Sequence, residues 1–136
     1  MGILKPRGIR NNNPLNIRIS STPWVGKCIG NTDGSFEQFQ TLEYGLRAAI
    51  VNIRTYIKRD HIDTVRAIIS KWAPASDGNN VAAYVSVVCQ KANLEASTRV
   101  RYNDKNVICR LVWAMAFVEC GEDVSFGRVE NAWALI

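Results

Sequence analysis

The chain has 136 residues, a hydrophobic fraction of 47%, a charged fraction of 21% and a formal net charge of +5. This length and composition are typical of a single soluble globular domain with its own core. No apolar run is long enough to cross a membrane, and the beginning of the chain lacks the apolar stretch of a secretory signal peptide, so we expect neither feature.

The first predicted element is a small sheet in residues 8–40. This segment is rich in turn signals, among them Asn13-Pro14 and Asp33-Gly34. Between the turns lie two short β-like segments, residues 16–19 and 35–39. They predict a sheet of two or three short strands.

Residues 41–136 are predicted to hold four or five helices. Thr41 is suited to cap the first helix, whose apolar residues recur every three or four positions: Leu42, Leu46, Ile50, Ile53 and Ile57. Asp63 is suited to cap the second helix, and Pro74 to end it.

The third helix is predicted to follow the turn at residues 77–80, and residues 93–104 form a polar connection. A long apolar helix comes next, and Ser125 is suited to cap a short last helix. The predicted fold class is therefore a compact, mostly helical α+β domain that spans residues 1–136.

The helix predicted at residues 106–118 is apolar on nearly every side, which is typical of a helix in the middle of a fold. Glu119 follows Val112 and Met115 at helical spacing, and Gly121 is suited to end the helix. The pattern places a carboxyl group at the end of a core helix, where burial favours its protonated form. A frayed helix end, with Glu119 in water, is the alternative.

The four cysteines contain no C-x-x-C pair, and the lone His61 does not complete a usual zinc site. We therefore expect no metal and no cofactor. Cys89 and Cys109 lie in apolar helical patterns, which predicts buried thiols, and without a signal peptide all four cysteines are expected to be reduced.

The stretch from Arg7 to Arg18 reads R-G-I-R-N-N-N-P-L-N-I-R. It resembles the R-G-I-R-N-N-N-P-G-N-I-R opening of a family of small bacteriophage proteins, which are described as virion or structural proteins and suspected to be lysozyme-like. The pattern F-x-x-F-x-T-x-E-x-G-L-R-A at residues 36–48 and A-M-A-F-V-E-C-G at residues 114–121 are similar to the same family. Leu15 stands where the family usually has glycine, and Cys120 where it usually has asparagine.

The end of this pattern also looks like the helix of wall-cleaving lysozymes that ends in a catalytic glutamate. In those enzymes a small sheet follows that helix, whereas here the sheet-like segment comes first. The resemblance implies a circularly permuted lysozyme-like core, an arrangement that is feasible when chain ends meet at the surface.

Cleavage of a glycosidic bond needs a carboxylic acid that stays protonated near neutral pH. Glu119 is the predicted general acid. Glu43 is the second choice for a catalytic carboxylate, because the family motif contains it. Its alternative role is structural, since a negative charge suits a first helical turn and Arg47 is a natural partner one turn later. Asp33 and Glu37 are weaker candidates, interpreted as a turn residue and an exposed strand residue.

Three residues are predicted to bind substrate: Asn16, Arg18 and Trp24. An asparagine amide both donates and accepts hydrogen bonds to sugar groups, and a tryptophan in a Pro/Gly loop is placed to stack on a sugar ring. The neighbouring asparagines are interpreted as turn residues. Trp72 and Tyr84 share helical stripes with isoleucine and valine, so we assign them to the core.

We therefore expect a phage-type lysozyme-like monomer that cleaves peptidoglycan, an anionic wall polymer, as a muramidase or a lytic transglycosylase. It would act on the bacterial wall from the host cytoplasm or from the virion. The dispersed basic residues argue against a nucleic-acid partner, and we expect no membrane insertion. A virion structural or wall-binding protein without chemistry is the alternative.

Overall fold

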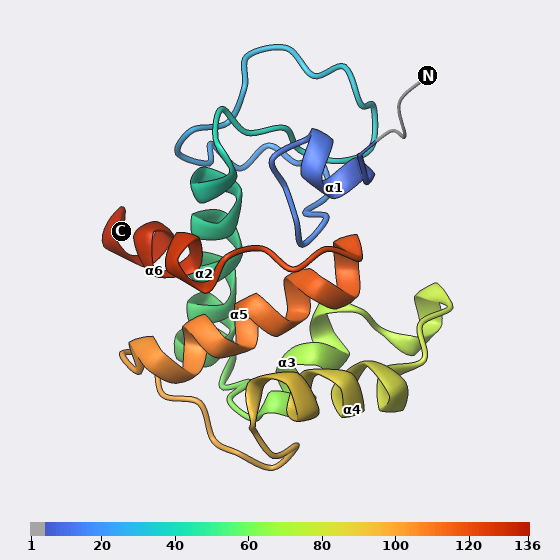
Figure 1. The fold of residues 1–136 in the computed structure, drawn as a ribbon, viewed down its shortest axis with the longest axis vertical. Coiled ribbons are helices and arrows are strands. Elements are labelled where there is room, and N and C mark those ends of the chain that lie inside the picture. Colours follow the sequence, from blue (N-terminus) through green and yellow to red (C-terminus); the bar gives the residue numbers. More distant parts are fainter. Residues whose placement is uncertain (1–4) are drawn as a thin grey trace.

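The computed structural model describes residues 5–136. The expectation about a signal peptide concerns the beginning of the chain, and residues 1–4 lie outside the described part. The described chain is mostly helical and compact, as predicted (Figure 1). Six α-helices and one 3-10 turn follow in order: α1 (Arg7–Arg10), α2 (Leu42–Asp60), α3 (Val65–Trp72), η1 (Ala75–Asp77), α4 (Val81–Ala92), α5 (Lys105–Cys120) and α6 (Phe126–Ala134).

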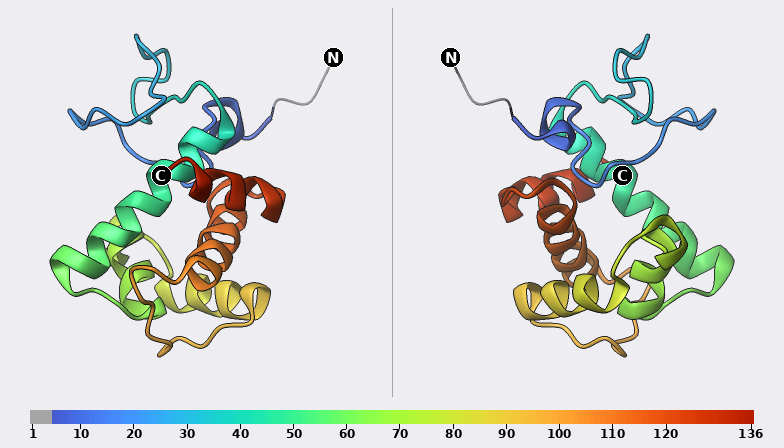
Figure 2. Two further views of the ribbon diagram at one scale, coloured as in Figure 1. Left: turned by 90° about the vertical axis from the view of Figure 1, so that its left-hand side faces the viewer. Right: turned by 90° about the vertical axis from the view of Figure 1, so that its right-hand side faces the viewer.

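The helices pack around α2 and α5. α2 packs against α6, while α5 lies between α4 and α6 and also contacts α1. Both views of Figure 2 place the loops of residues 11–41 at one end of α2 and α4 at the other end. None of the described helices is long and apolar enough to cross a membrane.

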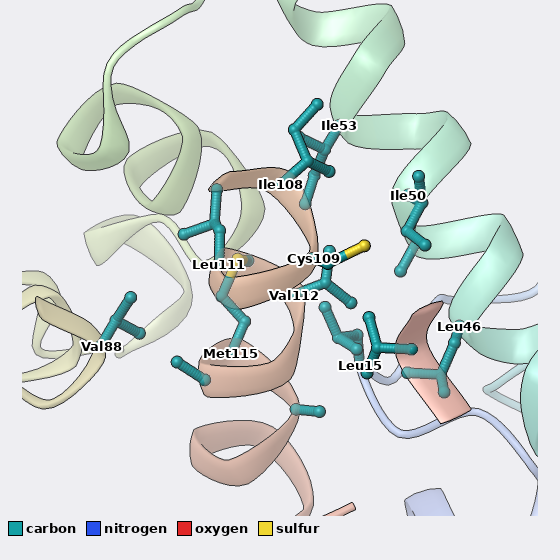
Figure 3. Close-up of a cluster of buried hydrophobic side chains, with 14 of the residues drawn as sticks. Leu15, Leu46, Ile50, Ile53, Val88, Ile108, Cys109, Leu111, Val112 and Met115 are labelled. Atoms are coloured by element: carbon teal, nitrogen blue, oxygen red, sulfur yellow. The ribbon is translucent and has the colours of Figure 1, made fainter. Parts of the chain in front are cut away.

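The hydrophobic core is centred on α5, as its sequence predicts. The side chains of Ile108, Val112 and Met115 are fully buried between α2 and α4. Figure 3 shows them in one cluster with Leu46, Ile50 and Ile53 of α2 and Val88 of α4. Leu15, from the loop segment, is 1% exposed and belongs to the same cluster, so the loops are anchored in the helical core.

Most helix ends lie where the sequence places them. Thr41 caps α2 by accepting a hydrogen bond from the Tyr44 amide, and Gly121 ends α5 in the left-handed conformation. The prediction of Asp63 as the cap of the next helix is wrong, because Thr64 caps α3. Asp63 instead accepts a 2.8 Å hydrogen bond from Arg99.

The predicted N-terminal sheet does not form. In residues 5–41 the structure contains only isolated antiparallel bridges, Arg18 with Phe36 and Lys27 with Phe39, and no strand. Asn12 and Asn16 adopt left-handed φ angles of 52° and 54°, which interrupt an extended backbone. The amino-acid types favour strands, but the asparagine-rich turns divide the segment into pieces too short to pair as a sheet.

Asparagine side chains take over the backbone pairing that a sheet would provide. The buried Asn13 amide donates to the carbonyls of Ile17 and Glu37 at 2.9 and 3.0 Å, and its oxygen accepts from the Ile17 amide at 3.0 Å. The local role predicted for these asparagines is therefore present. At Gly45 of α2, an added Cβ would lie 1.8 Å from the Asn12 carbonyl oxygen, so only glycine lets this segment approach the helix so closely.

All four cysteines are free, which agrees with the expectation of thiols rather than disulfides. Cys109 is buried as predicted, and so is Cys120, but the prediction of a buried thiol at Cys89 is wrong, because Cys89, like Cys28, is partly exposed. Burial raises the pKa of the Cys109 thiol to about 11, so this thiol stays protonated and packs as an apolar group. Residues 5–136 contain no group of three or more potential metal-ligating side chains.

Candidate active site

A cleft separates part of the N-terminal segment from α3 and the turn that follows it. It consists of two adjoining cavities of about 400 and 200 Å³. Both cavities are lined by Asn16, Arg18, Trp72 and Asp77. Glu119 lines the smaller cavity, and Trp24 lines the larger one. The two cavities together are called the cleft below.

Glu119 reaches the cleft because α5 carries it there from the core. It occupies the last turn of α5, one helical turn beyond Met115 on the same buried side, and the helix ends at Gly121. The Tyr84 hydroxyl donates a 2.9 Å hydrogen bond to Glu119 Oε2. The Asn16 amide lies 3.4 Å from Oε1 and 3.2 Å from the Glu119 backbone oxygen. The structure thus supports a partly buried carboxyl group rather than a frayed end in water.

The surroundings of Glu119 favour its protonated form. Burial raises the pKa of Glu119, and the hydrogen bonds from Tyr84 and Asn16 oppose that rise because they favour the ionised form. Burial is the largest of these effects. Burial and the neighbouring carboxyl group also raise the pKa of Tyr84, so its hydroxyl remains a neutral donor.

Asn16 is held against Glu119 by its neighbours in the chain. Its left-handed φ of 54° is one that asparagine tolerates. Leu15 anchors the preceding position in the core, and the Trp72 indole donates a 3.2 Å hydrogen bond to the Leu15 carbonyl. A contact between positions 16 and 119 therefore depends on the packing of the loop segment against both α3 and α5.

The structure brings Asn16, Arg18 and Glu119 to one cavity. Arg18 is exposed, and its guanidinium lies 5.2 Å from the centre of the Phe36 ring. Trp24 lies along the other cavity; its side chain is half-buried, and its indole N–H is buried without a hydrogen-bond partner in the described structure. The three predicted substrate-binding residues therefore line one continuous surface, with Trp24 away from the carboxyl group.

Glu43 lies elsewhere. It lines neither cavity of the cleft, and its carboxylate accepts two hydrogen bonds from Arg128 of α6, at 2.7 and 2.9 Å. The Arg128 guanidinium lowers the pKa of Glu43. Arg47, the partner expected from helical spacing, instead donates to the Leu135 carbonyl. The geometry gives Glu43 a role in joining α2 to α6, which is the structural alternative.

The two weaker candidates also have structural partners. Asp33 accepts hydrogen bonds from Arg7 and Asn11 and from the amides of its own turn, and these bonds lower its pKa strongly. The interpretation of Glu37 as an exposed residue is wrong, because it is 1% exposed and pairs with Lys27 at 3.0 Å. The backbone at this position is fixed by the buried Asn13 amide, which donates to the Glu37 carbonyl at 3.0 Å.

Sequence reasoning missed three residues of the cleft region. Tyr84 is buried as predicted, but its hydroxyl contacts Glu119, and a buried tyrosine needs such a partner. Trp72 packs on Tyr56 and also lines both cavities, so it is more than a core residue. The sequence predicts Asp77 only as part of a turn, whereas in the structure it is the second carboxylate that lines the smaller cavity. No pattern in the sequence linked these positions to residue 119.

Comparison with known proteins adds one relative. No family model matches the sequence. Over 97 residues, or 69% of this chain, the sequence is 34% identical to Protein P5 of Pseudoalteromonas phage PM2. The chain spans about 60% of the length of that protein. This similarity supports the bacteriophage part of the resemblance, while the relative's name states no activity.

Proposed function

We propose that this chain is a lysozyme-like phage protein that cleaves the glycan strand of peptidoglycan, with Glu119 as general acid. The observation that carries this proposal is a carboxyl group whose pKa is raised by burial, placed beside the Asn16 amide in an open cleft. General acid catalysis requires this combination of raised pKa and access to substrate.

The hydrogen bonds of Glu119 indicate which oxygen would donate the proton. Tyr84 donates to Oε2 at 2.9 Å, whereas the Asn16 amide reaches Oε1 only at 3.4 Å, so Oε1 is the less firmly bound oxygen and the proposed site for a transferable proton. In the proposed step this proton moves to the glycosidic oxygen while the bond from that oxygen to the anomeric carbon breaks. The electron pair of the broken bond stays with the departing oxygen.

The second half of the reaction has two forms. In hydrolysis, water attacks the anomeric carbon and loses its proton to a base, and Asp77 is the other carboxylate in the cavity. In transglycosylation, the 6-hydroxyl of the sugar attacks and returns a proton to Glu119, so one carboxylate suffices. If Asp77 is needed as a base, the enzyme is of the muramidase type. If activity does not need Asp77, the enzyme is of the transglycosylase type.

A permuted lysozyme-like core would explain how distant parts of the chain form one site. The N-terminal segment carries Asn16 and packs at the end of α5, where Glu119 lies 103 residues later. We place the activity at the bacterial wall, reached from the host cytoplasm or from the virion, with the chain acting as a monomer. The phage relative supports this setting.

The test is lysis of purified peptidoglycan by wild type and Glu119→Gln. Glutamine keeps the size of the side chain but has no titratable proton, so activity should fall about a hundredfold or more. Glu43→Gln is the matched control, with activity kept and a stability cost of about 1 kcal/mol for the loss of its ion pair with Arg128 and of a helix-end charge. Equal lysis by wild type and Glu119→Gln would refute the assignment.

Asp77→Asn decides between the two forms of the reaction. Loss of turnover would support a base at Asp77, whereas continued turnover with 1,6-anhydro products would support transglycosylation. Mass spectrometry of the released fragments distinguishes these products.

The second candidate function is a virion structural or wall-binding protein without chemistry. Leu15 and Cys120 favour it, because both depart from the resembling family next to the site. Both side chains are buried, and Leu15 also lines the smaller cavity. Absence of lysis on several wall types, together with binding to the same walls, would establish this alternative.

A further inference from the structure

We infer that the cleft holds a subsite for carboxylate groups, formed by Arg18 and Lys71, that recognises the peptide stems of peptidoglycan in preference to an unsubstituted glycan. This inference rests on the proposed function and names the part of the substrate that the larger cavity would bind. Arg18 comes from the loop segment, Lys71 comes from α3, and both line that cavity.

Aromatic rings hold both cations in place. The Arg18 guanidinium lies 5.2 Å from the Phe36 ring centre, and Lys71 Nζ lies 5.2 Å from the Tyr56 ring centre. A cation over a ring face is attracted by the ring quadrupole and still presents its N–H donors to a ligand. The two side chains are therefore partly oriented before any ligand arrives.

Neither cation forms an ion pair within residues 5–136, although Lys71 is close enough to Asp60, outside the cavity, to help lower the pKa of that carboxyl group. Arg7, Lys27 and Arg128 each bind a described carboxylate, whereas Arg18 and Lys71 do not. The larger cavity contains one carboxylate, Asp77, against these two cations. The rest of its polar lining is made of neutral amides, hydroxyls and aromatic groups, so the cavity carries a net positive charge.

The charge and the neutral lining together fit a substituted glycan. Amide groups can bind sugar hydroxyls, and aromatic rings can stack on sugar faces. This neutral lining is sufficient to bind a glycan strand without peptide stems. Two free cations beside this lining have no partner on a neutral strand. Peptidoglycan differs from chitin-like strands in its lactyl-linked peptide stems, which end in carboxylates, and an arginine binds a carboxylate with two parallel hydrogen bonds.

The experiment compares binding of two soluble ligands of equal sugar length by calorimetry. One is a neutral chitooligosaccharide, and the other is a muropeptide chain that carries its stems. Arg18→Gln and Lys71→Gln are matched with Arg101→Gln and Lys105→Gln, which remove the same charge at exposed positions outside the cleft. A third ligand, with stems removed by amidase, separates the stem carboxylates from the lactyl carboxylate.

We expect wild type to prefer the stemmed chain. Each cleft variant should reduce that preference about fivefold, the upper end for an exposed ion pair, while the two controls keep it. The preference should also weaken at high salt. Equal preference in wild type and the Arg18→Gln, Lys71→Gln double variant would overturn the subsite, and so would the absence of any preference in wild type.

Lysis is measured separately, so the two proposals fail in different ways. A wild type that does not lyse walls, but prefers the stemmed chain through Arg18 and Lys71, removes the enzymatic proposal and keeps the subsite. If wild type lyses walls but shows no preference for the stemmed chain, the enzymatic proposal stands and the subsite is refuted.

Discussion

The N-terminal segment, residues 5–41, and the helical part, residues 42–136, are held together by different forces. The helical part buries aliphatic side chains such as Leu111 and Val112 around α5. The N-terminal segment has few such residues and instead ties its backbone with asparagine side chains, above all Asn13. The cleft lies where the two parts meet. The apolar helical part contributes Glu119, the proposed acid, and the polar N-terminal segment contributes groups that can bind a ligand.

The largest effect is expected where the two parts share a core. Leu15→Ala removes a side chain that is 1% exposed and should lower the free energy of unfolding by about 2–5 kcal/mol, because it leaves a cavity. Leu46→Ala, in α2 of the same cluster, is the matched control with a similar expected loss. Chemical denaturation measures both.

A small loss for Leu15→Ala beside a large loss for Leu46→Ala would contradict a shared core. The N-terminal segment would then be an appendage of the helices. Asn16 could not be held firmly against Glu119 in that case.

A smaller effect is expected from the polar side of the comparison. Asn13→Ala leaves the buried Ile17 amide and the Glu37 carbonyl without their partners, while the Ile17 carbonyl keeps its bond from the Glu37 amide, and it should cost about 1–3 kcal/mol. Hydrogen exchange should show the Ile17 amide losing protection first, because its bond is to the Asn13 side chain. Asn103→Ala, at an exposed position, should change stability by less than about 0.5 kcal/mol.

If exchange at Ile17 stays unchanged in Asn13→Ala, the segment is held by its apolar anchors alone. Both parts of the molecule would then be stabilised mainly by apolar packing, and they would differ only in how much of it each part has.

The last prediction concerns pH and sharpens the contrast at the cleft itself. Because the pKa of Glu119 is raised in the folded state, its contribution to stability is complete below the ordinary carboxyl pKa. That contribution is lost as pH rises through the raised value. Glu119→Gln should lack this decline, so its stability relative to wild type should increase with pH over this window. Thermal unfolding between acidic and neutral pH measures the difference.

Tyr84→Phe provides the comparison variant. It removes a hydrogen bond that favours ionised Glu119, so the pH window should extend upward. Parallel curves for wild type and Glu119→Gln would show that Glu119 titrates as it does in water, which would remove the basis for general acid catalysis.

The helices were predictable because their signals are local. The spacing of Ile108, Val112 and Met115, the cap at Thr41 and the glycine at position 121 each act within one or two turns. The sheet was predicted wrongly because strand propensity does not reveal whether a partner strand is available. α1 was missed because its four residues, Arg7–Arg10, are too few to show a helical period.

The sequence by itself determined that a carboxyl group ends the central helix. Glu119 continues an apolar stripe, and helical geometry alone keeps it on that side. The choice of Asn16 and Arg18 as cleft residues also came from the sequence, through a motif rather than through spacing.

Only the tertiary structure decided which groups surround Glu119. Tyr84 and Asn16 lie 35 and 103 residues away from it in the chain, and Asp77 shares its cavity because the turn after α3 faces the N-terminal segment. Such contacts arise from the packing of whole elements, and no local pattern encodes them. For the same reason Arg128, rather than the nearby Arg47, became the partner of Glu43.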